Sequence, residues 1–425
     1  MTGHCLDLPW RDPLAAFAPL AGQARALLLH DGRNGRARIF AQPAACFDGD
    51  GRSAFERLAA SARAGGGMHA GLFGYDLAAA FERLPHLDPR WPPLAFARYD
   101  VWAELDRDAD RLRIHAPDAT AAAAFADRLG AEDAGDPDAG PAGPARLTPR
   151  WSREIYLQAA RRARDYVHAG DVFQVNLSQG FDIDLAAGDA PWPAFRRLCA
   201  ASPAPHAAYF CIDSERVVMT NSPERFLDVR EGRVEARPIK GTRRRADDPA
   251  ADAALAAELA DSAKDRAENL MIVDLMRNDL SRVCQPGTVT VPVLCEIETY
   301  ANVHHLVSVV EGRLAADRDV FDLLTASFPP GSITGAPKVR AMEIISELEG
   351  EPRGPYCGAL GWIGGRGAMD LNVMIRTAAL RRTALGWRAS LRSGGGIVAD
   401  SDPVSEYEET LTKASALRRA FGVGA

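Results

Sequence analysis

The segment Glu132–Pro149, with the sequence EDAGDPDAGPAGPARLTP, divides the chain into two regions of different pattern. Its Asp, Pro and Gly residues favour turns and leave little side-chain surface to bury in a core. We therefore expect a linker or surface loop at 132–149, between an N-terminal region at 1–131 and a larger region at 150–425. Strand patterns dominate the first region, and helical and strand patterns alternate in the second, which predicts a mixed α and β protein.

Short strands are predicted in the first region. Ala26–His30 and Arg38–Ala41 are apolar runs of strand length. The turn-forming sequence DRDAD separates Tyr99–Leu105 from Arg111–His115, which predicts a hairpin.

Helices are predicted with strands in the second region. The three helices are Tyr156–Ala169, Lys264–Val283 and a last one that begins at the cap Asp402 and runs to about Ala420. Two strands are also predicted. Val172–Ser178 alternates, with Phe173, Val175 and Leu177 on one face. Met369–Thr377 directs Asp370, Asn372 and Arg376 to one side.

Composition excludes several classes of protein. The net charge is −7 with no basic block, which argues against nucleic acid as a partner. No apolar run approaches the roughly 20 residues that a membrane span requires. The first residues, 1–13, lack the pattern of a signal peptide. Seven scattered cysteines without a C-x-x-C pair indicate reduced thiols in a cytoplasmic protein.

Lysine is rare in this chain. Only four of the 50 Lys and Arg residues are lysine, at positions 240, 264, 338 and 413. Of these two residue types, only lysine readily loses its proton and attacks carbon, or acts as a compact point charge. The surviving lysines are therefore candidates for chemical roles, although each could also have survived by chance.

Acidic residues recur on two predicted helices. Glu406 and Glu409 share a stripe with Lys413, and a glycine run just before this helix allows a ligand to approach the backbone closely. Asp265 and Glu268 lie three apart on the other helix. Two such pairs could hold Mg²⁺, which takes oxygen ligands from one or two carboxylates, water and substrate. A solvated, ion-paired face is the alternative explanation.

Two further segments carry groups suited to acid–base or covalent chemistry. Lys240 lies beside a glycine in Pro238–Thr242, and Ser222-Pro-Glu224 precedes it. A lysine with a lowered pKa can act as a nucleophile, and a buried glutamic acid can act as a general acid. Either residue could equally belong to a structural ion pair. The segment Gly331–Lys338 lacks the residue order of a nucleotide-binding loop. Residue patterns alone therefore indicate an α/β enzyme for a small anionic substrate, with magnesium as an open possibility.

Taken together, these segments resemble the chorismate-utilising enzymes, a family that includes anthranilate, aminodeoxychorismate, isochorismate and salicylate synthases. Nine motifs occur in the family's order and cover nearly everything from Tyr156 to Ala414. They are GDVFQVNLSQ, SPERF, RPIKGTRRR, DRAENLMIVDLMRNDLSRV, VHHLVS, GSITGAPKVRAMEII, YCGALGWI, NVMIRTA and GGGIVADSDPVSEYEETLTKA. The N-terminal region matches more weakly, through LPW and GLFGYDLAAAFERLP. The resemblance implies an α/β (α+β) fold like that of anthranilate synthase component I, with two layered, mostly antiparallel sheets and outer helices.

The resemblance also implies residue roles by matching position. Glu268 and Glu409 match the family's magnesium ligands, and Asp265 and Glu406 match acids that support them. The magnesium would anchor the ring carboxylate of chorismate. Glu224 matches the general acid that protonates the departing C4 hydroxyl.

The remaining matched positions line the substrate pocket. Arg376 matches a group that holds the pyruvyl carboxylate, a task that suits the two-pronged guanidinium. The other groups matched to that carboxylate are Tyr356 and a loop formed by Ser393, Gly394, Gly395 and Gly396. Further pocket positions are matched by Gly241, Thr242, Thr334 and Lys413, and His305 matches the pocket histidine.

Two positions select the reaction that we expect. Isochorismate and salicylate synthases resemble one another in having a lysine base at the position of Gln174, and glutamine cannot activate water. Anthranilate synthases have alanine in place of Lys240, whereas PIKGT resembles aminodeoxychorismate synthases. In the family's proposed mechanism this lysine attacks C2 of chorismate before ammonia attacks C4. The expected product is 4-amino-4-deoxychorismate, used for p-aminobenzoate and folate synthesis.

No glutaminase nucleophile motif occurs in this chain, so the resemblance implies that a separate glutamine amidotransferase subunit supplies ammonia. Two other functions stay open at this point. One is anthranilate synthase component I, which would eliminate pyruvate. The other is a catalytically silent subunit that only docks an amidotransferase, and the presence of Glu224, Lys240, Glu268 and Glu409 argues against it.

Overall fold

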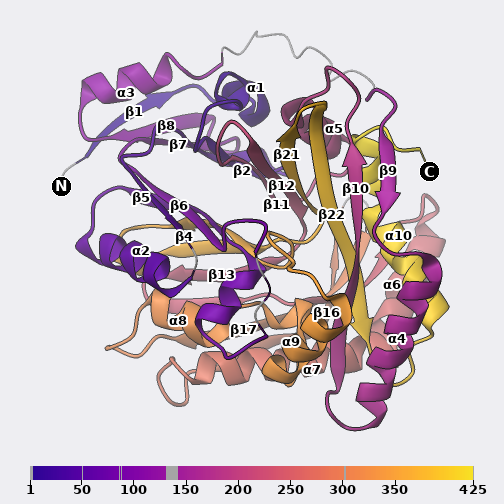
Figure 1. The fold of residues 1–425 in the computed structure, drawn as a ribbon. Helices are drawn as coiled ribbons and strands as arrows, with labels where there is room; N and C mark the ends of the chain where they lie inside the picture. Colours follow the sequence, from indigo (N-terminus) through magenta and orange to yellow (C-terminus); the bar gives the residue numbers. More distant parts are fainter. Residues whose placement is uncertain are drawn as a thin grey trace.

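Two antiparallel sheets form the framework of the molecule (Figure 1). The computed structural model describes residues 3–49, 51–85, 87, 89–130, 142–300 and 303–424. Within these residues one sheet has twelve strands, in the order β1-β8-β7-β3-β2-β11-β12-β21-β22-β10-β18, with β9 paired to β10. The other has ten, in the order β15-β17-β14-β13-β20-β19-β5-β6-β4, with β16 paired to β17. The predicted fold class is confirmed.

The strands of the larger sheet come from the whole length of the chain. They are β1 (His4–Leu8), β2 (Leu27–Asp31), β3 (Arg36–Phe40), β7 (Trp102–Asp106), β8 (Arg111–Ala116), β9 (Arg146–Pro149), β10 (Gln174–Asp184), β11 (His206–Cys211), β12 (Arg216–Ser222), β18 (Gly335–Ala336), β21 (Thr377–Thr383) and β22 (Gly386–Ile397).

The smaller sheet is built in the same mixed way. Its strands are β4 (Ala45–Gly49), β5 (Met68–Phe73), β6 (Leu94–Tyr99), β13 (Arg225–Arg230), β14 (Arg233–Ala236), β15 (Ile239–Arg244), β16 (Thr290–Thr299), β17 (Val303–Arg313), β19 (Ala359–Ile363) and β20 (Met369–Val373).

The sheets face one another across a buried apolar layer. Leu27 and Phe210 of the larger sheet belong to one cluster with Leu72 and Trp362 of the smaller sheet. Helices cover the opposite faces. Helices α2 (Arg52–Ala64), α7 (Ala263–Ser281) and α8 (Val320–Ser327) pack on the smaller sheet. The larger sheet is covered by α1 (Pro13–Phe17), α3 (Ala119–Ala126), α4 (Arg153–His168), α5 (Pro191–Ala201), α9 (Lys338–Glu349) and α10 (Pro403–Ala420).

Short elements complete the chain. Helix α6 (Pro249–Asp261) contacts β15, β16 and β17. The 3₁₀ turns are η1 (Ala18–Leu20), η2 (Tyr75–Ala80), η3 (Gly331–Ile333) and η4 (Gly365–Gly367). None of the helices in the described part of the chain combines the length and the apolar character needed to cross a bilayer.

Most predicted helices lie where the sequence placed them. The structure has α4 at Arg153–His168 and α7 at Ala263–Ser281, each within a few residues of prediction. The last helix, α10, begins at Pro403, and the Asp402 carboxylate accepts the Ser405 N–H as its cap. The predicted hairpin is also confirmed as β7 and β8, although Tyr99 ends β6 in the other sheet.

Two strand predictions were wrong in detail. The predicted strand Met369–Thr377 ends at Val373, because the chain turns and Arg376 takes a φ of 50° before β21 begins. Phe173 was placed with Val175 and Leu177, but it precedes β10 and is 71% exposed, whereas the other two are buried. Alternation does not reveal where a strand begins, so a residue just before it can point to solvent.

The predicted loop at 132–149 contains a strand at its end. Residues 146–149 form β9, which pairs with Phe181–Asp184 of β10. Residues 131–141 lie outside the described part of the chain. Both sheets combine strands from before and after this segment, and the division into three regions stays a prediction.

Shared cores predict that the two regions unfold together. Phe73 of β5 is 1% exposed, and its ring contacts those of Phe55, Phe96 and Phe328. Phe73→Ala should lower the stability of the entire molecule by about 3–5 kcal/mol, because it leaves a cavity between the regions. Thermal unfolding should stay a single transition at a lower midpoint. Leu385→Ala, at a residue 92% exposed, is the control. Two separate transitions, with only one shifted, would contradict the shared core.

Candidate functional site

Lys240 lies at an irregularity in the edge strand β15. The pairing of β15 with β17 shifts register between Lys240 and Thr242, which leaves Gly241 unpaired with a φ of 75°. A Cβ at Gly241 would lie 2.7 Å from Leu259 and 2.9 Å from the Asp265 carboxyl carbon. Only glycine fits this bulge, and the bulge sets the direction of the Lys240 side chain.

The Lys240 amine is placed among carboxylates. Its Nζ donates a hydrogen bond to the Ser332 carbonyl at 3.2 Å. Burial lowers the pKa of Lys240 from its ordinary value, and the charges of Glu268 and Glu224 act in the opposite direction. The net lowering increases the fraction of neutral amine at a given pH.

Glu224 lies in the connection between β12 and β13 and is 5% exposed. Burial raises the pKa of this carboxyl to about 7, against the lowering effects of the Ser332 side chain and Lys240. A substantial share of Glu224 is therefore protonated near neutral pH and able to donate a proton. Ser332 contacts both groups and was not among the predicted site residues.

A second group of residues adjoins the bulge. His305 of β17 and Thr242 of β15 share a hydrogen bond of 2.9 Å between Nδ1 and Oγ1. Burial, followed by the nearby charge of Arg376, lowers the pKa of His305 to about 4, so the imidazole is neutral. The adjacent His304 instead contacts Asp252 at 2.9 Å.

The Arg376 guanidinium is available to an anion. Burial lowers its pKa from the ordinary value. In the described part of the chain it forms no salt bridge, whereas the buried Arg353 and Arg392 do. A buried cation without a protein carboxylate is poised to bind the carboxylate of a ligand.

Acids from two helices meet near Lys264. Its Nζ lies 4.0 Å from Glu268 of α7 and 3.9 Å from Glu406 of α10. Burial raises the pKa of both carboxyls. Burial also acts to raise the pKa of Glu409, but Lys413, at 2.5 Å, outweighs it and lowers the value. The Asp265 carboxylate forms an ion pair with Arg243 at 3.3 Å.

The glycine run lies inside a strand and was wrongly predicted to be a loop. Gly394, Gly395 and Gly396 belong to β22 and pair with Ser178, Leu177 and Asn176 of β10. Ser393 pairs with Gln179.

Because the glycines of this run have no side chains, helix α10 can pack closely against it. A Cβ at Gly395 would lie 3.0 Å from the Glu406 carboxylate and 3.6 Å from that of Glu409. Lys413 donates a hydrogen bond to the Gly394 carbonyl at 3.1 Å.

Thr334 directly follows η3, and Tyr356 lies in the turn between α9 and β19. The Thr334 hydroxyl bonds to the carbonyls of Pro330 and Gly331, two residues from Ser332. Tyr356 is buried, and burial raises its pKa well above the ordinary value. Within the described residues neither side chain is hydrogen-bonded to Lys240 or Glu224, so their place in one substrate pocket stays a prediction.

The predicted residues therefore fall into connected groups. The charges of Glu224, Glu268, Glu409 and Lys413 all act on the pKa of Lys240, so residues of α7 and α10 lie close to β15. His305 joins Thr242 to Arg376.

Sequence patterns assigned no specific site role to Ser332 or Lys264, whereas Gln174 was singled out as a position that selects the reaction. Ser332 lies inside a motif, but nothing in its spacing indicates a contact with Lys240. Lys264 lies just outside the motifs, and only the rarity of lysine drew attention to it. Gln174 is fully buried, with both amide atoms lacking a hydrogen-bond partner among the described residues. Lys338, in contrast, forms an internal ion pair with Asp279 at 2.6 Å.

The donor set is compatible with magnesium. Among the described residues no three His, Cys, Asp or Glu side chains converge closely enough to enclose a metal alone. Magnesium, however, typically uses one or two carboxylates and completes its shell with water and substrate. Glu268 and Glu409 lie close enough for the charge of Glu409 to raise the pKa of Glu268, and Lys264 supplies positive charge to both carboxylates. These two carboxylates therefore fit a magnesium site that a substrate completes.

A cavity lies next to this site. It has a volume of about 590 Å³ between the two sheets and is lined by several arginines, including Arg33, Arg225 and Arg237. Ile239 and Arg225, the neighbours of Lys240 and Glu224, contribute to its wall.

Comparison with known proteins assigns the family. The model of the chorismate binding enzymes matches residues 24–419, and the chain belongs to this family. The family prediction is confirmed.

Individual relatives carry two different names. An aminodeoxychorismate synthase component 1 from Klebsiella aerogenes is 41% identical over 96% of both chains. An anthranilate synthase component 1 from Thermus thermophilus is 42% identical over 82% of this chain and 76% of its own. The crystal structure of anthranilate synthase component I from Streptococcus pneumoniae superimposes with a TM-score of 0.80, at 28% identity, covering 90% of this chain and 92% of that one.

Proposed function

We propose that this chain is component I of an aminodeoxychorismate synthase, which converts chorismate and ammonia into 4-amino-4-deoxychorismate for p-aminobenzoate and folate synthesis. The observation that carries the proposal is the Lys240 amine beside the buried Glu224, with Ser332 in contact with both. The name of the Klebsiella aerogenes relative, similar over 96% of each chain, supports it.

The alternative is anthranilate synthase component I. The Thermus thermophilus relative is as similar in identity, so overall identity does not separate the two reactions. Lys240 favours the aminodeoxychorismate reaction. Its motif PIKGT resembles aminodeoxychorismate synthases, whereas anthranilate synthases have alanine at the position of this lysine.

The proposed reaction uses the two buried groups in turn. The neutral Lys240 amine forms a bond to C2 of chorismate, the ring double bonds shift, and the C4–oxygen bond breaks. Glu224 gives its proton to the departing hydroxyl, which leaves as water. Ammonia then forms a bond to C4, the bond from C2 to Lys240 breaks, and a proton returns to Glu224. Chorismate and ammonia thus give the amino product and water.

Charge complementarity supports the proposed orientation of chorismate. Arg376, with Tyr356 and the β22 backbone, would hold the pyruvyl carboxylate through its free guanidinium. Glu268 and Glu409 would hold Mg²⁺, supported by Asp265 and Glu406. Magnesium would supply positive charge to the ring carboxylate. His305, neutral and fixed by Thr242, would serve as an uncharged hydrogen-bonding group.

A partner subunit is part of the proposal. We infer that a glutamine amidotransferase supplies the ammonia, because the chain lacks a glutaminase nucleophile motif and its relatives are named as components. We also propose a cytoplasmic location, which the seven unbonded cysteines support.

Lys240 variants test the choice of reaction. Lys240→Ala should slow aminodeoxychorismate formation by roughly 10³-fold or more, because a covalent nucleophile is lost. It should also expose C2 to ammonia and give traces of an anthranilate-type product. Lys240→Arg should be no better, since guanidinium stays protonated. Products are identified by mass spectrometry. High activity in Lys240→Arg, with no chorismate adduct on the Lys240 peptide, would contradict covalent attack.

The ionisation of Glu224 can be observed directly. Because its pKa is raised to about 7, the carboxyl should be protonated below that pH and ionised above it. The infrared band of a protonated carboxyl should therefore disappear as pH rises through about 7 in the wild type and be missing in Glu224→Gln. Turnover by Glu224→Gln should fall by roughly 10²–10⁴-fold. Identical infrared titrations of the two proteins would refute the assignment.

Magnesium binding can be measured separately from activity. With chorismate bound and no ammonia present, calorimetry should detect Mg²⁺ binding that weakens roughly tenfold or more in Glu268→Gln and in Glu409→Gln. Glu408→Gln makes the same charge change at the next, exposed position of α10 and is the control. Chelation should abolish turnover, and added magnesium should restore it. Unchanged Mg²⁺ affinity in both site variants would rule out these ligands.

A further inference from the structure

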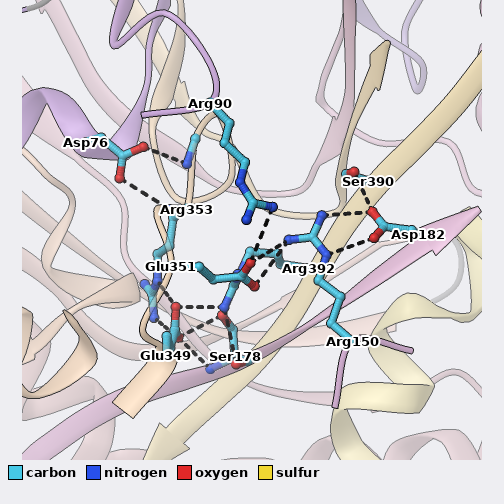
Figure 2. Close-up of polar contacts among 11 residues, drawn as sticks. Asp76, Arg90, Arg150, Ser178, Asp182, Glu349, Glu351, Arg353, Ser390 and Arg392 are labelled. Atoms are coloured by element: carbon cyan, nitrogen blue, oxygen red, sulfur yellow. Dashed lines mark hydrogen bonds and ion pairs between the residues drawn. The ribbon is translucent and has the colours of Figure 1, made fainter. Parts of the chain in front are cut away.

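A buried network of charges lies behind the site, centred on Glu349 at the end of α9 (Figure 2). The Glu349 side chain is fully buried and forms ion pairs with Arg353 and Arg392. It also accepts hydrogen bonds from the backbone and hydroxyl of Ser178, at 2.9 and 2.8 Å. Burial acts to raise the pKa of Glu349, but the two arginines outweigh it and lower the value. The carboxylate is therefore charged and fully bonded.

Arg353 extends this network toward the site. It forms a two-pronged contact with Glu349, at 3.0 and 2.7 Å. Its other nitrogen donors bond to backbone carbonyls of Ile333, at 3.1 Å, and Asn176, at 2.7 Å. The guanidinium side chain is only 1% exposed, so each of these contacts is made away from bulk water.

Both carbonyls belong to segments that carry proposed substrate-binding groups. Ile333 directly precedes Thr334, and the Thr334 carbonyl accepts the Asn176 N–H at 2.8 Å. Asn176 in turn pairs with Gly396 of the glycine run. One guanidinium thus bonds to both sides of the junction between η3 and β10.

The same arginine also contacts two aromatic rings. It lies 4.8 Å from the centre of the Tyr75 ring and 5.8 Å from that of Tyr356. Tyr356 is only three residues further along the chain. Asp76, beside Tyr75, accepts the backbone N–H groups of Arg353 and Gly354 at 3.2 and 2.8 Å (Figure 2). A residue of the N-terminal region is therefore hydrogen-bonded to the turn that leads into Tyr356.

We infer that Arg353, held by Glu349 and Asp76, is a positioning residue that fixes Thr334 and Tyr356 for chorismate binding. It touches none of the reacting groups and acts through the backbone of Ile333 and Asn176. The inference deepens the proposed function and rests on the assignment of Thr334 and Tyr356 to the substrate pocket.

A simple stabilising role does not explain this arrangement well. Buried ion pairs contribute little net stability on average, because the cost of removing both charges from water offsets their attraction. What the pair provides is direction: the planar guanidinium binds a carboxylate with two donors and reaches carbonyls with the others. A lysine could pair with Glu349 but could not span Ile333, Asn176 and the carboxylate together.

The outer end of the same network offers a matched control. Arg150 forms a two-pronged contact with Asp182, at 3.1 and 2.8 Å, and an ion pair with Glu351 at 3.1 Å. Glu351 connects this end to Arg392. Among the described residues Arg150 forms its ion pairs with Asp182 and Glu351 and none with η3 or the turn before Tyr356, so Arg150→Lys makes the same chemical change in the network without reaching those segments.

The test compares Arg353→Lys with Arg150→Lys in the full-length protein. Arg353→Lys should raise the KM for chorismate and its directly measured Kd by roughly ten- to a hundredfold, because binding groups are displaced. The kcat at saturating chorismate should change less than about twofold, since only ground-state binding is lost. Arg150→Lys should leave KM and Kd unchanged. Equal effects of the two variants, or an unchanged Kd in Arg353→Lys, would overturn the inference.

A milder variant covers the case in which Arg353→Lys fails to fold. Asp76→Asn keeps one acceptor oxygen but weakens the grip on the two backbone N–H groups, and it should raise the chorismate Kd in the same direction. An unchanged Kd in a folded Asp76→Asn protein would then overturn the inference. Binding is measured with chorismate alone and no ammonia. A wild type that binds chorismate but makes no aminodeoxychorismate would refute the proposed function and leave this test valid.

Discussion

Ten residue pairs join β10 to β22, and the glycine run within this ladder determines how the site is assembled. Because Gly395 has no side chain, the carboxylates of Glu406 and Glu409 can lie against the strand backbone. The same ladder presents Asn176 and Ser178 to the buried Arg353 and Glu349. This single strand pair thus contacts both the acidic helix α10 and the buried ion pair of Arg353 and Glu349. Residues distant in sequence therefore lie close together around it.

The distribution of cations follows a consistent physical logic. Arginines serve the ion pairs that need fixed geometry, as at Arg353 and Arg392. Lysines lie where a compact or ionisable amine is required. Lys240 lies beside Glu224, and Lys413 contacts Glu409. Lys338 instead forms an ion pair with Asp279 inside the fold. Scarcity of lysine therefore pointed to charged, partly buried positions, but only some of them belong to the site.

Local signals predicted much of this architecture, and contacts between distant segments account for what they missed. The cap Asp402 and the spacing of Glu406, Glu409 and Lys413 predicted α10, because caps and helical spacing are local. The two-sheet fold was implied by the resemblance to the chorismate-utilising family. Sequence spacing could not place Ser332 against Lys240, since that contact joins residues 92 apart.

The errors have the same origin. The glycine run was predicted to be a loop, whereas its pairing with β10 makes it a strand. Arg376 lies outside its predicted strand because a backbone turn intervenes.

The proposed role of Lys240 is to direct ammonia to C4 of chorismate. The most direct test of this role is the mass of the product that the purified chain forms from chorismate and ammonium. If Lys240 directs the attack in this way, ammonium should give 4-amino-4-deoxychorismate and glutamine alone should give no product. Anthranilate and pyruvate as the main products would contradict it.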